Sequence, residues 1–474
     1  MSLRAEKILR DQRRTAFVAA LLAAGFAVLA PVSALAATTW TVTNCTDSTG
    51  AGLPGSLRSA ITSAASNDTI DMTGLTCGTL EMVGSAITIS QNSLTLNGPG
   101  MGKLTIGCSA AQGCNGLPDR LLNHTNTGTL FINDLSLAYG NLYSAPSSAR
   151  GGCIYSAGTV AIKHVGVSHC QARSSTVAEG GAIYAKDGLS MQYSTLSYNL
   201  ADGQTARGGA VRTNGTFSAK YSTISKNKAS GSSSAVVGGG LYLGGNVSIT
   251  SSTISGNSAT KFGGIGIYSA NPASRTTTIT NSTISGNTGS EFSGGLYVNS
   301  GTVNIRNSTI TLNTDGNGTN YAAGMATSAR LGPMAVTLQS SLIANNTSGT
   351  TESDLSKTRT SANTITFSGN NNLIGSTAAA VPPDTIKNSC PLLGPLRDNG
   401  GLTQTHALLS HSPAIDTGNN AANQHEDQRR DSLSDSLPYP YPRVSGMTAD
   451  IGAYEVQQDD IVFNTGFDGC PLLM

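Results

Sequence analysis

The middle of the chain repeats a six-residue phrase in which polar and apolar positions alternate. The phrase reads Ser-Thr-Leu-Ser-Tyr-Asn at residues 194–199 and Ser-Thr-Ile-Ser-Gly-Asn at residues 252–257. Successive first serines lie 28, 30, 30, 26 and 33 residues apart. A period of this size that varies by a few residues predicts a solenoid whose loops differ in length. The other copies begin at Ser222, Ser282, Ser308 and, in weaker form, Ser341.

Two further segments recur with the same period. One has two glycines, an apolar residue and usually a tyrosine, as in Gly238-Gly-Gly-Leu-Tyr242. The other is a short β-branched run such as Val247-Ser-Ile249. Each repeat therefore has three segments of strand length and no helix-length apolar stripe. Three short strands per coil predict an all-β fold, a parallel β-helix.

Alternation assigns each side chain of the phrase to one face of a strand. In the copy at 252–255, Ile254 points into the core, and Thr253 and Ser255 face water. One coil cannot bury its own apolar face, so coils stack about 4.8 Å apart and share a core. The asparagines that end successive phrases then lie at one corner, where amides hydrogen-bond from coil to coil. This structural ladder is predicted for Asn199, Asn227, Asn257, Asn287 and Asn313.

One amphipathic helix is predicted, within residues 53–65. Leu57, Ala60, Ile61 and Ala64 form its apolar face, and Ser56 can cap its start. Laid across the first coil, this short helix would cover the open strand edges and the core beneath them.

The chain divides into five parts. Residues 1–36 have a basic start, an apolar run and a small-residue cleavage site, which predicts a signal peptide cut after Ala36. No later stretch is long and apolar enough to span a membrane. The remaining parts are an N-terminal cap at 37–80, the β-helix at 81–380, last coils and a C-terminal cap at 381–456, and a tail at 457–474.

All eight cysteines follow the predicted signal peptide. An even number in an oxidising compartment predicts disulfides. No Cys-x-x-Cys or His-x-x-His spacing is present, so we expect no metal site. From their proximity in the chain or at its ends we pair Cys45 with Cys77, Cys108 with Cys114, Cys153 with Cys170, and Cys390 with Cys470.

Composition narrows the classes of function. Of 474 residues, 56 are glycine and only 12% are charged, which suits one long solenoid with many short turns. The formal net charge is +1 and no basic stripe is present, so the sequence indicates no nucleic-acid partner. We expect a monomer without a cofactor.

Both ends of the chain resemble a group of bacterial β-helix surface proteins. Gly55-Ser-Leu-Arg-Ser-Ala-Ile61 is similar to their CSLREA-type start, although Gly55 stands where the family has cysteine. Ser412-Pro-Ala-Ile-Asp416 and Asp450-Ile-Gly-Ala-Tyr-Glu455 resemble the choice-of-anchor Q members. The repeats are similar to polymorphic outer-membrane-protein and pectate-lyase-like β-helices. The resemblance implies a right-handed β-helix, export and display at a bacterial surface, and it implies no reaction.

Candidate catalytic residues are few. The six histidines are scattered, and none lies in a nucleophile motif. Asn313-Thr-Asp-Gly316 resembles the first acidic motif of polygalacturonases, but no Asp-Asp pair or Arg-Ile-Lys motif follows. Because such hydrolases need paired carboxylates, we assign no catalytic residue.

Charge is densest near the C-terminus. These residues could hold a divalent cation or an anionic ligand, but we favour a salt-bridged cap over the last coil. They are Asp416, Glu426, Asp427, Arg429, Arg430, Asp431, Arg443, Asp450 and Glu455.

The glycine phrases align into a candidate ligand-binding column. Each of its members follows an inward apolar residue, so each should point outward, where aromatic faces can bind sugar rings or a protein. The alternative is self-stacking that only covers the sheet. The column comprises Tyr155, Tyr184, Arg212, Tyr242, Tyr268 and Tyr297.

These patterns predict a secreted or surface-displayed interaction module, adhesin-like or glycan-binding, whose partner is a surface glycan or a protein. Two alternatives stay open. One is a polysaccharide lyase or glycoside hydrolase of the pectin-lyase-like fold. The other is a structural stalk without a ligand.

Overall fold

A computed structural model describes residues 36–107, 119–144, 147–268, 275–316, 321–358, 363–421, 423–430, 440–458 and 460. The chain forms two compact units, at residues 1–37 and 38–474. Of the first unit, the structure describes only residues 36 and 37. The predicted signal peptide therefore lies outside the described residues except for Ala36. Most of the predicted tail at 457–474 also lies outside them.

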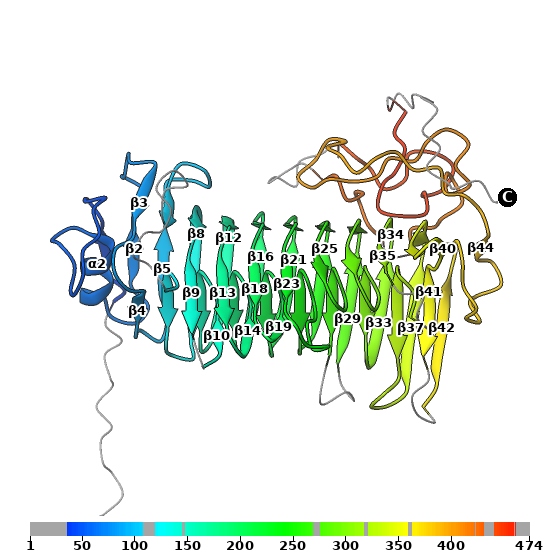
Figure 1. Cartoon of the computed structure of the whole chain (residues 1–474). Coiled ribbons are helices and arrows are strands. Elements are labelled where there is room, and N and C mark those ends of the chain that lie inside the picture. The colour runs from blue at the N-terminus through cyan, green and yellow to red at the C-terminus, as the bar shows by residue number, and fades with distance from the viewer. Residues whose placement is uncertain are drawn as a thin grey trace, which may run out of the picture. The chain divides into compact units, whose positions relative to one another are not determined.

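Three large sheets and one small sheet form the second unit, a right-handed parallel β-helix (Figure 1). The 22-stranded sheet contains β1 (Thr39–Thr41), β2 (Thr69–Asp71), β3 (Thr79–Glu81), β5 (Leu94–Asn97), β6 (Thr105–Gly107), β8 (Thr129–Ala138), β12 (Thr159–Ser168), β16 (Gly188–Gln192), β17 (Thr195–Ser197), β21 (Thr216–Lys220), β22 (Thr223–Ser225), β25 (Val247–Thr250), β26 (Thr253–Ser255), β29 (Thr276–Thr280), β30 (Thr283–Ser285), β33 (Gly301–Arg306), β34 (Thr309–Thr311), β37 (Met334–Gln339), β38 (Leu342–Ala344), β42 (Ile365–Asn370), β43 (Leu373–Ile374) and β44 (Ile386–Lys387).

The ten-stranded sheet contains β4 (Ile87–Ile89), β7 (Leu122–His124), β11 (Ile154–Ser156), β15 (Ile183–Ala185), β20 (Val211–Thr213), β24 (Leu241–Leu243), β28 (Ile265–Ile267), β32 (Leu296–Val298), β36 (Met325–Ser328) and β41 (Leu355–Thr358). The nine-stranded sheet contains β9 (Asn141–Ser144), β13 (Gln171–Ser174), β18 (Leu200–Asp202), β23 (Lys228–Ser230), β27 (Ser258–Ala259), β31 (Thr288–Gly289), β35 (Thr314–Asp315), β39 (Thr347–Ser348) and β40 (Thr351–Glu352). The three-stranded sheet contains β10 (Ala149–Arg150), β14 (Val177–Glu179) and β19 (Thr205–Arg207).

A middle coil runs through the three large sheets in order, as β24, β25, β26 and β27 do. The 22-stranded sheet receives two strands from each such coil, because the chain bends between them. The three predicted segments are β24, β25 and β26. The sequence analysis missed the two- or three-residue strand that follows each ladder asparagine, because such a strand is too short to give a period.

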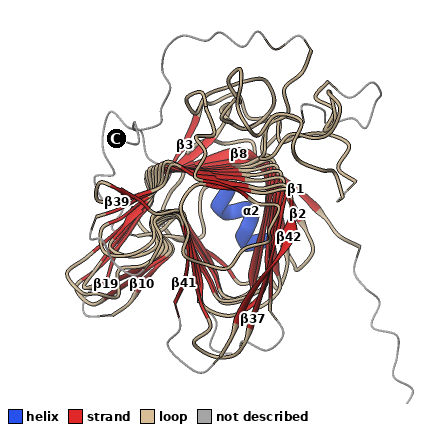
Figure 2. Cartoon of the chain, turned by 90° about the vertical axis from the view of Figure 1, so that its right-hand side faces the viewer, coloured by secondary structure: helices blue, strands red, loops and turns tan. Residues whose placement is uncertain are grey.

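The core follows from the alternation within the phrase. Ile224, Ile254 and Ile284 are register partners on β22, β26 and β30, and all three are fully buried. In Figure 2, which looks along the stack, the strands form layers around the space that these side chains fill. Each coil thus completes the core of its neighbours, as the repeat predicted.

The only helix among the described residues, α2 (Leu57–Ser63), crosses this space at the N-terminal end (Figure 2). The amide of Ser59 donates to Oγ of Ser56 over 3.3 Å, so Ser56 caps the helix as predicted. Leu57 and Ile61 are buried against the first coils. Gln91 donates from Nε2 to the carbonyls of Ile61 and Ala64, 2.8 Å each, and satisfies the C-terminal turn.

For residues 381–456 we predicted last coils and a C-terminal cap. The strand β44 belongs to such a last coil, but the residues after it do not form a cap over it. They run back along the outer face of the 22-stranded sheet, drawn orange to red in Figure 1. Oγ1 of Thr253 donates to the carbonyl of Gln404 over 2.6 Å, and Oγ1 of Thr283 donates to Oε1 of Gln428 over 2.6 Å. We call the described residues from 388 to 458 the C-terminal segment.

This placement also corrects the prediction that Thr253 and Ser255 face water. Both side chains point away from the core, as alternation requires, but both are buried. Their outward face is the surface on which the C-terminal segment lies. Alternation predicts the face of a side chain and gives no information about what covers that face.

Candidate functional site

The predicted ligand-binding column does not form as one row of six side chains. Tyr155, Tyr184, Arg212 and Tyr242 are register partners in the ten-stranded sheet, as predicted. Their next partner is Gly266, which is followed by Tyr297, so Tyr268 lies outside the row. Tyr268 lies two residues too late because its glycine phrase contains an additional Ile-Gly.

Charged side chains of the three-stranded sheet cover much of this column. The guanidinium carbon of Arg150 lies 5.2 Å from the ring centroid of Tyr184. Glu179 accepts from Arg150 over 2.9 Å and from Arg207 over 3.1 Å. Farther along the column the ring of Phe262 stacks on Tyr297, with centroids 4.1 Å apart. Tyr184 and Tyr297 are each only 6% exposed, so the prediction of an open aromatic platform is wrong at these two positions.

The electrostatics of this region fit a closed structure. Burial by itself would raise the pKa of Glu179, but Arg150, Arg212 and Arg207 together lower it. Glu179 is therefore a carboxylate shared by three arginines. It fixes the three-stranded sheet against the outer face of the ten-stranded sheet.

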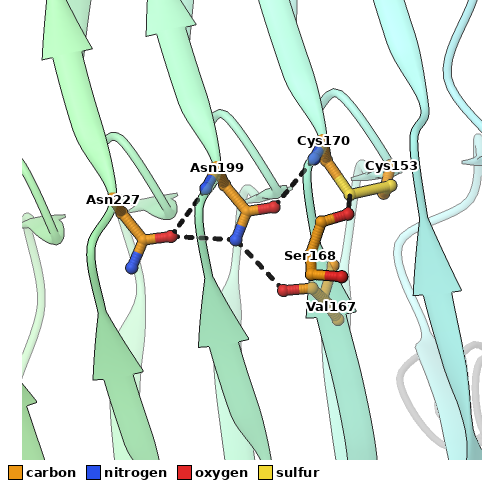
Figure 3. Close-up of a disulfide and its surroundings, with 6 residues drawn as sticks. All are labelled: Cys153, Val167, Ser168, Cys170, Asn199 and Asn227. Atoms are coloured by element: carbon orange, nitrogen blue, oxygen red, sulfur yellow. Dashed lines mark hydrogen bonds between the residues drawn. A yellow bond between two sulfur atoms is a disulfide. The ribbon is translucent and has the colours of Figure 1, made fainter. Parts of the chain in front are cut away.

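The asparagine ladder is present. Nδ2 of Asn199 donates to Oδ1 of Asn227 over 2.9 Å (Figure 3). Asn227 donates in the same way to Asn257. The series continues through Asn287 and Asn313 to Asn346, and all of these side chains are buried. Each amide also donates to a backbone carbonyl inside the coil, as Asn199 does to Val167. The ladder satisfies the polar groups of the corner, which is a structural role.

Each end of the ladder has its own termination. At the N-terminal end Cys170 takes the place of an asparagine, donates its amide to Oδ1 of Asn199 and forms a disulfide with Cys153 (Figure 3). At the other end Asn346 donates to Oδ1 of Asp354 over 2.7 Å. Burial, with a smaller contribution from the neighbouring Glu352, raises the pKa of Asp354 to about 8.

The first serine of each phrase forms a second ladder that the sequence analysis missed. The amide of Ser194 donates to Oγ of Ser222 over 3.2 Å, and that of Ser222 to Oγ of Ser252 over 3.1 Å. These serines lie at the bend between the two strands that each coil gives to the 22-stranded sheet. The strict repetition of these serines in the sequence could have revealed the ladder, because an exposed serine has no structural reason to recur at one position.

The outer face of the 22-stranded sheet has an uncovered part. We call the outward positions of the second half of β12 and of β17 and β22 the open strip. Its side chains are half-buried, and among the described residues their hydroxyls have no hydrogen-bond partner. The strip comprises Gly166, Ser168, Thr195, Ser197, Thr223 and Ser225.

Two stacks of aromatic rings border the open strip. The bend stack joins His164 to Tyr193 and Tyr193 to Tyr221, with ring centroids 5.0 Å apart in both pairs. The corner stack is made of Tyr139, His169 and Tyr198, with centroids 5.0 and 5.2 Å apart. Because the rings lie face to face, they present edges and polar tips, rather than open faces, beside the strip.

All six stacked residues have a left-handed backbone conformation, with φ between 49° and 62°. Bulky side chains rarely adopt it, because Cβ then lies close to the following carbonyl. The stacking of rings on successive coils offsets part of this strain. Residues held in strained conformations concentrate at functional sites, so we regard the two stacks as the rims of a candidate site. The sequence analysis missed them because they lie at positions where the repeat varies: Tyr193 and Tyr221 precede the first serine of the phrase, and Tyr198 precedes the ladder asparagine.

The same face is occupied in the later coils. We call the outward positions of β26, β30 and β34 the covered strip. Ser285 lies 2.8 Å from Nε2 of His406, and Oγ1 of Thr309 accepts the amide of Ala453 over 3.0 Å. Burial lowers the pKa of His406, so its neutral form is favoured in this contact. The hydroxyl floor of the strip therefore binds polar groups laid against it.

The terminal charges stabilise the C-terminal segment internally. Asp427 and Arg429 form an ion pair of 2.9 Å, and both are fully buried. The guanidinium carbon of Arg429 lies 3.8 Å from the ring centroid of Tyr454. Burial raises the pKa of Glu455 to about 8, against the lowering effect of Arg443. The predicted salt bridges are present, but they lie along the face of the 22-stranded sheet instead of over the last coil. Asp431 lies outside the described residues.

Two of the four predicted disulfides are confirmed, Cys45–Cys77 and Cys153–Cys170. Cys390 is disulfide-bonded, but its predicted partner Cys470 lies outside the described residues, as do Cys108 and Cys114.

Asp315, the residue of the polygalacturonase-like motif, lies on β35. It is buried and accepts a hydrogen bond from Ser348 over 3.2 Å. Among the described residues, no three His, Cys, Asp or Glu side chains gather where they could hold a metal ion. No helix in the described part of the chain is long and apolar enough to cross a membrane.

Comparison of the chain with protein-family models, with curated proteins and with solved structures finds no match. The parallel β-helix rests on the structure alone, and the specific resemblance to choice-of-anchor Q proteins stays a prediction.

Proposed function

We propose that the chain is an exported interaction module that binds a carbohydrate chain along the open strip. The observation that carries this proposal is a row of free hydroxyls between two strained aromatic stacks. The resemblance of the chain ends to surface-displayed β-helix proteins, and the predicted signal peptide, support export and display.

The floor of the open strip has the chemistry that a sugar needs. The hydroxyls of Thr195, Ser197, Thr223 and Ser225 can each donate and accept, as sugar hydroxyls do. The binding of Gln404 and Gln428 by Thr253 and Thr283 supports this capacity, because those residues hold the same register positions on later coils.

The period of the strip favours a polysaccharide over a polypeptide. Coils repeat about every 4.8 Å, whereas an extended polypeptide advances about 3.3 Å per residue. A polypeptide along the strip would meet each coil in a different phase. A β-linked pyranose unit is close to the coil spacing in length, so each sugar would meet one equivalent set of hydroxyls and rim rings.

The test is a panel of neutral and acidic polysaccharides and oligosaccharides, incubated with purified protein lacking residues 1–36 and assayed for both binding and cleavage. The variant Tyr193→Ala/Tyr198→Ala removes one ring from each stack and should reduce binding at least tenfold. The protein should stay folded, because Tyr198 is 49% exposed and Tyr193 is half-buried.

Tyr143→Ala is the matched control, since Tyr143 is 60% exposed on β9, outside the open strip. Binding that survives in the folded double variant would exclude the open strip as the site. Absence of binding to every glycan would favour the stalk without a ligand.

A further inference from the structure

We infer that the open strip binds a short carbohydrate chain whose terminal sugar carries an acidic group. This inference rests on the proposed function and names the class of ligand. Two observations carry it: the strip is closed at both ends, and among the described residues lysines stand on both of its rims only at the C-terminal end.

The loop before β6 closes the N-terminal end. The amide of Gly102 donates to Oγ of Ser136 over 3.3 Å, on the coil before the strip. The side chain of Met101 is 48% exposed, and its Cγ lies 3.7 Å from where a Cβ on Gly166 would stand. A ligand lying on the strip therefore meets Met101 at the coil of β12.

The C-terminal segment closes the other end. The carbonyl of Gln404 holds Thr253, and Oγ1 of Thr403 donates to the carbonyl of Ser251 over 3.3 Å. Met101 lies at the coil of β12, so the coils of β17 and β22 lie between Met101 and Gln404. At about one sugar per coil, the floor between them holds about two sugar units. A longer polymer must leave the surface, so the strip suits an oligosaccharide or a chain end.

Two ammonium groups lie at the C-terminal end of the strip, one on each rim. Nζ of Lys220 lies 4.9 Å from the ring centroid of Tyr221 in the bend stack. Nζ of Lys226 lies 5.1 Å from the ring centroid of Tyr198 and donates to its hydroxyl over 2.8 Å. Among the described residues, no carboxylate lies within 4.0 Å of either ammonium.

The opposite end of the strip carries one lysine, Lys163, at the register of Lys220, and a carboxylate on the coil before it. Oδ1 of Asp134 lies 3.1 Å from Nδ1 of His164, and the carboxylate side chain is 48% exposed. The Asp134 carboxylate offsets the charge of Lys163 there, so an anionic sugar would be attracted more strongly to the coil of β22, which has two lysines. The strip is therefore electrically directional, and the acidic unit of the ligand lies between Lys220 and Lys226.

The experiment compares binding of cellotetraose, chitotetraose and mannotetraose with two acidic forms of each. One form is oxidised to an aldonate at the reducing end, and the other carries a uronate at the non-reducing end. One acidic isomer should bind about tenfold or more tightly than its neutral parent, as expected for a charge-assisted hydrogen bond. The isomer that is preferred gives the direction of the chain on the strip.

The variant Lys220→Gln/Lys226→Gln should lower the affinity for the acidic isomer to that of the neutral parent, and leave the neutral parent unchanged. Lys163→Gln is the matched control, because Lys163 has the register of Lys220 two coils away. It should keep the preference for the acidic isomer.

The outcomes separate the two proposals. Neutral oligosaccharides that bind without any gain from either acidic end overturn this inference and leave the proposed function standing. A preference that survives in the double lysine variant also overturns it. If none of the nine probes binds, both proposals fail together.

Discussion

The open strip and the covered strip are two regions of one sheet face with the same floor and different rims. Both floors carry a Thr-x-Ser or closely similar pair on each fully phrased coil. The rims of the open strip are stacked tyrosines and histidines, whereas the covered strip has Ser251 and Asn281 at its bends and Gly256 and Gly286 at its corners. The repeated phrase thus specifies the floor, and the residues between phrases decide what can lie on it.

The size and polarity of the rim side chains explain why the C-terminal segment lies on the covered strip and not on the open strip. Nδ2 of Asn281 donates to the carbonyl of Glu426 over 2.8 Å, so a small polar rim lets a polypeptide lie against the bend. At the corresponding bend two coils earlier, the ring of Tyr221 occupies this space. The C-terminal segment therefore lies along the covered strip, and its contact with the other half of the face is made at the bend, where the guanidinium carbon of Arg430 lies 5.8 Å from the ring centroid of Tyr221.

Arg429→Met should give the largest effect, because it leaves the buried Asp427 without its ion-pair partner. Breaking such a pair costs about 3–5 kcal/mol. We expect the C-terminal segment to loosen, with faster hydrogen exchange at the amide of Ala453, which donates to Thr309. Arg397→Met, an exposed position in the same segment, is the control. Unchanged exchange at Ala453 would contradict the role of the buried pair.

Ile224→Ala beneath the open strip and Ile284→Ala beneath the covered strip test whether the two halves share one core. Both isoleucines are fully buried. Each variant should lower the free energy of unfolding by about 2–5 kcal/mol in denaturant titrations. A large loss in only one of them would show that the covering segment, and not the stack, determines core stability.

Thr283→Val and Thr223→Val sharpen the comparison at the floor. Thr283 donates to Gln428, so its variant leaves a buried amide oxygen without that partner, at a cost of about 1–3 kcal/mol. Thr223 has no such bond, and its variant should change the free energy of unfolding by less than about 0.5 kcal/mol. Equal losses would mean that the contact with Gln428 contributes nothing.

The last prediction is a pH dependence at the end of the asparagine ladder, where Asn346 donates to Asp354. The folded pKa of Asp354 is about 8, against an ordinary value of 3.8, so the folded chain keeps a proton that the unfolded chain has lost. The free energy of unfolding should fall as pH rises from about 4 to about 8, by at most about 1.4 kcal/mol per pH unit. Glu455 acts in the same direction.

Asp354→Asn cannot titrate, so the fall measured by denaturant titration across this range should be smaller than in the unaltered chain. If both proteins give the same curve, Asp354 does not hold its proton in the folded state.

What repeats along the chain could be predicted. The period gave the coils, the inward isoleucines and the asparagine ladder. What occurs once could not: the path of the C-terminal segment depends on Gln404, His406 and Gln428 meeting hydroxyls more than 100 residues away. The predicted tyrosine column failed for a related reason, since the glycine phrase does not show that Arg150 and Glu179 lie above it.

The candidate site was predictable only in part. The hydroxyl floor follows from alternation, but its openness depends on tertiary placement. The rims were visible as Tyr198 and His169 at equivalent positions, yet left-handed corners usually take glycine or asparagine, so their aromatic character could be recognised as unusual only once φ was known.

The C-terminal segment also gives the stack an unequal resistance to mechanical load. Both described disulfides close loops within the stack, and the coils of the open strip are joined along the axis by hydrogen bonds and packing. From Thr253 to Ser340, the segment adds cross-links outside the sheet, including a 2.8 Å bond from Ser340 to the carbonyl of Asn419. Tension applied along the axis would therefore separate coils first in the N-terminal half, which the segment does not cross-link, and last in the cross-linked half.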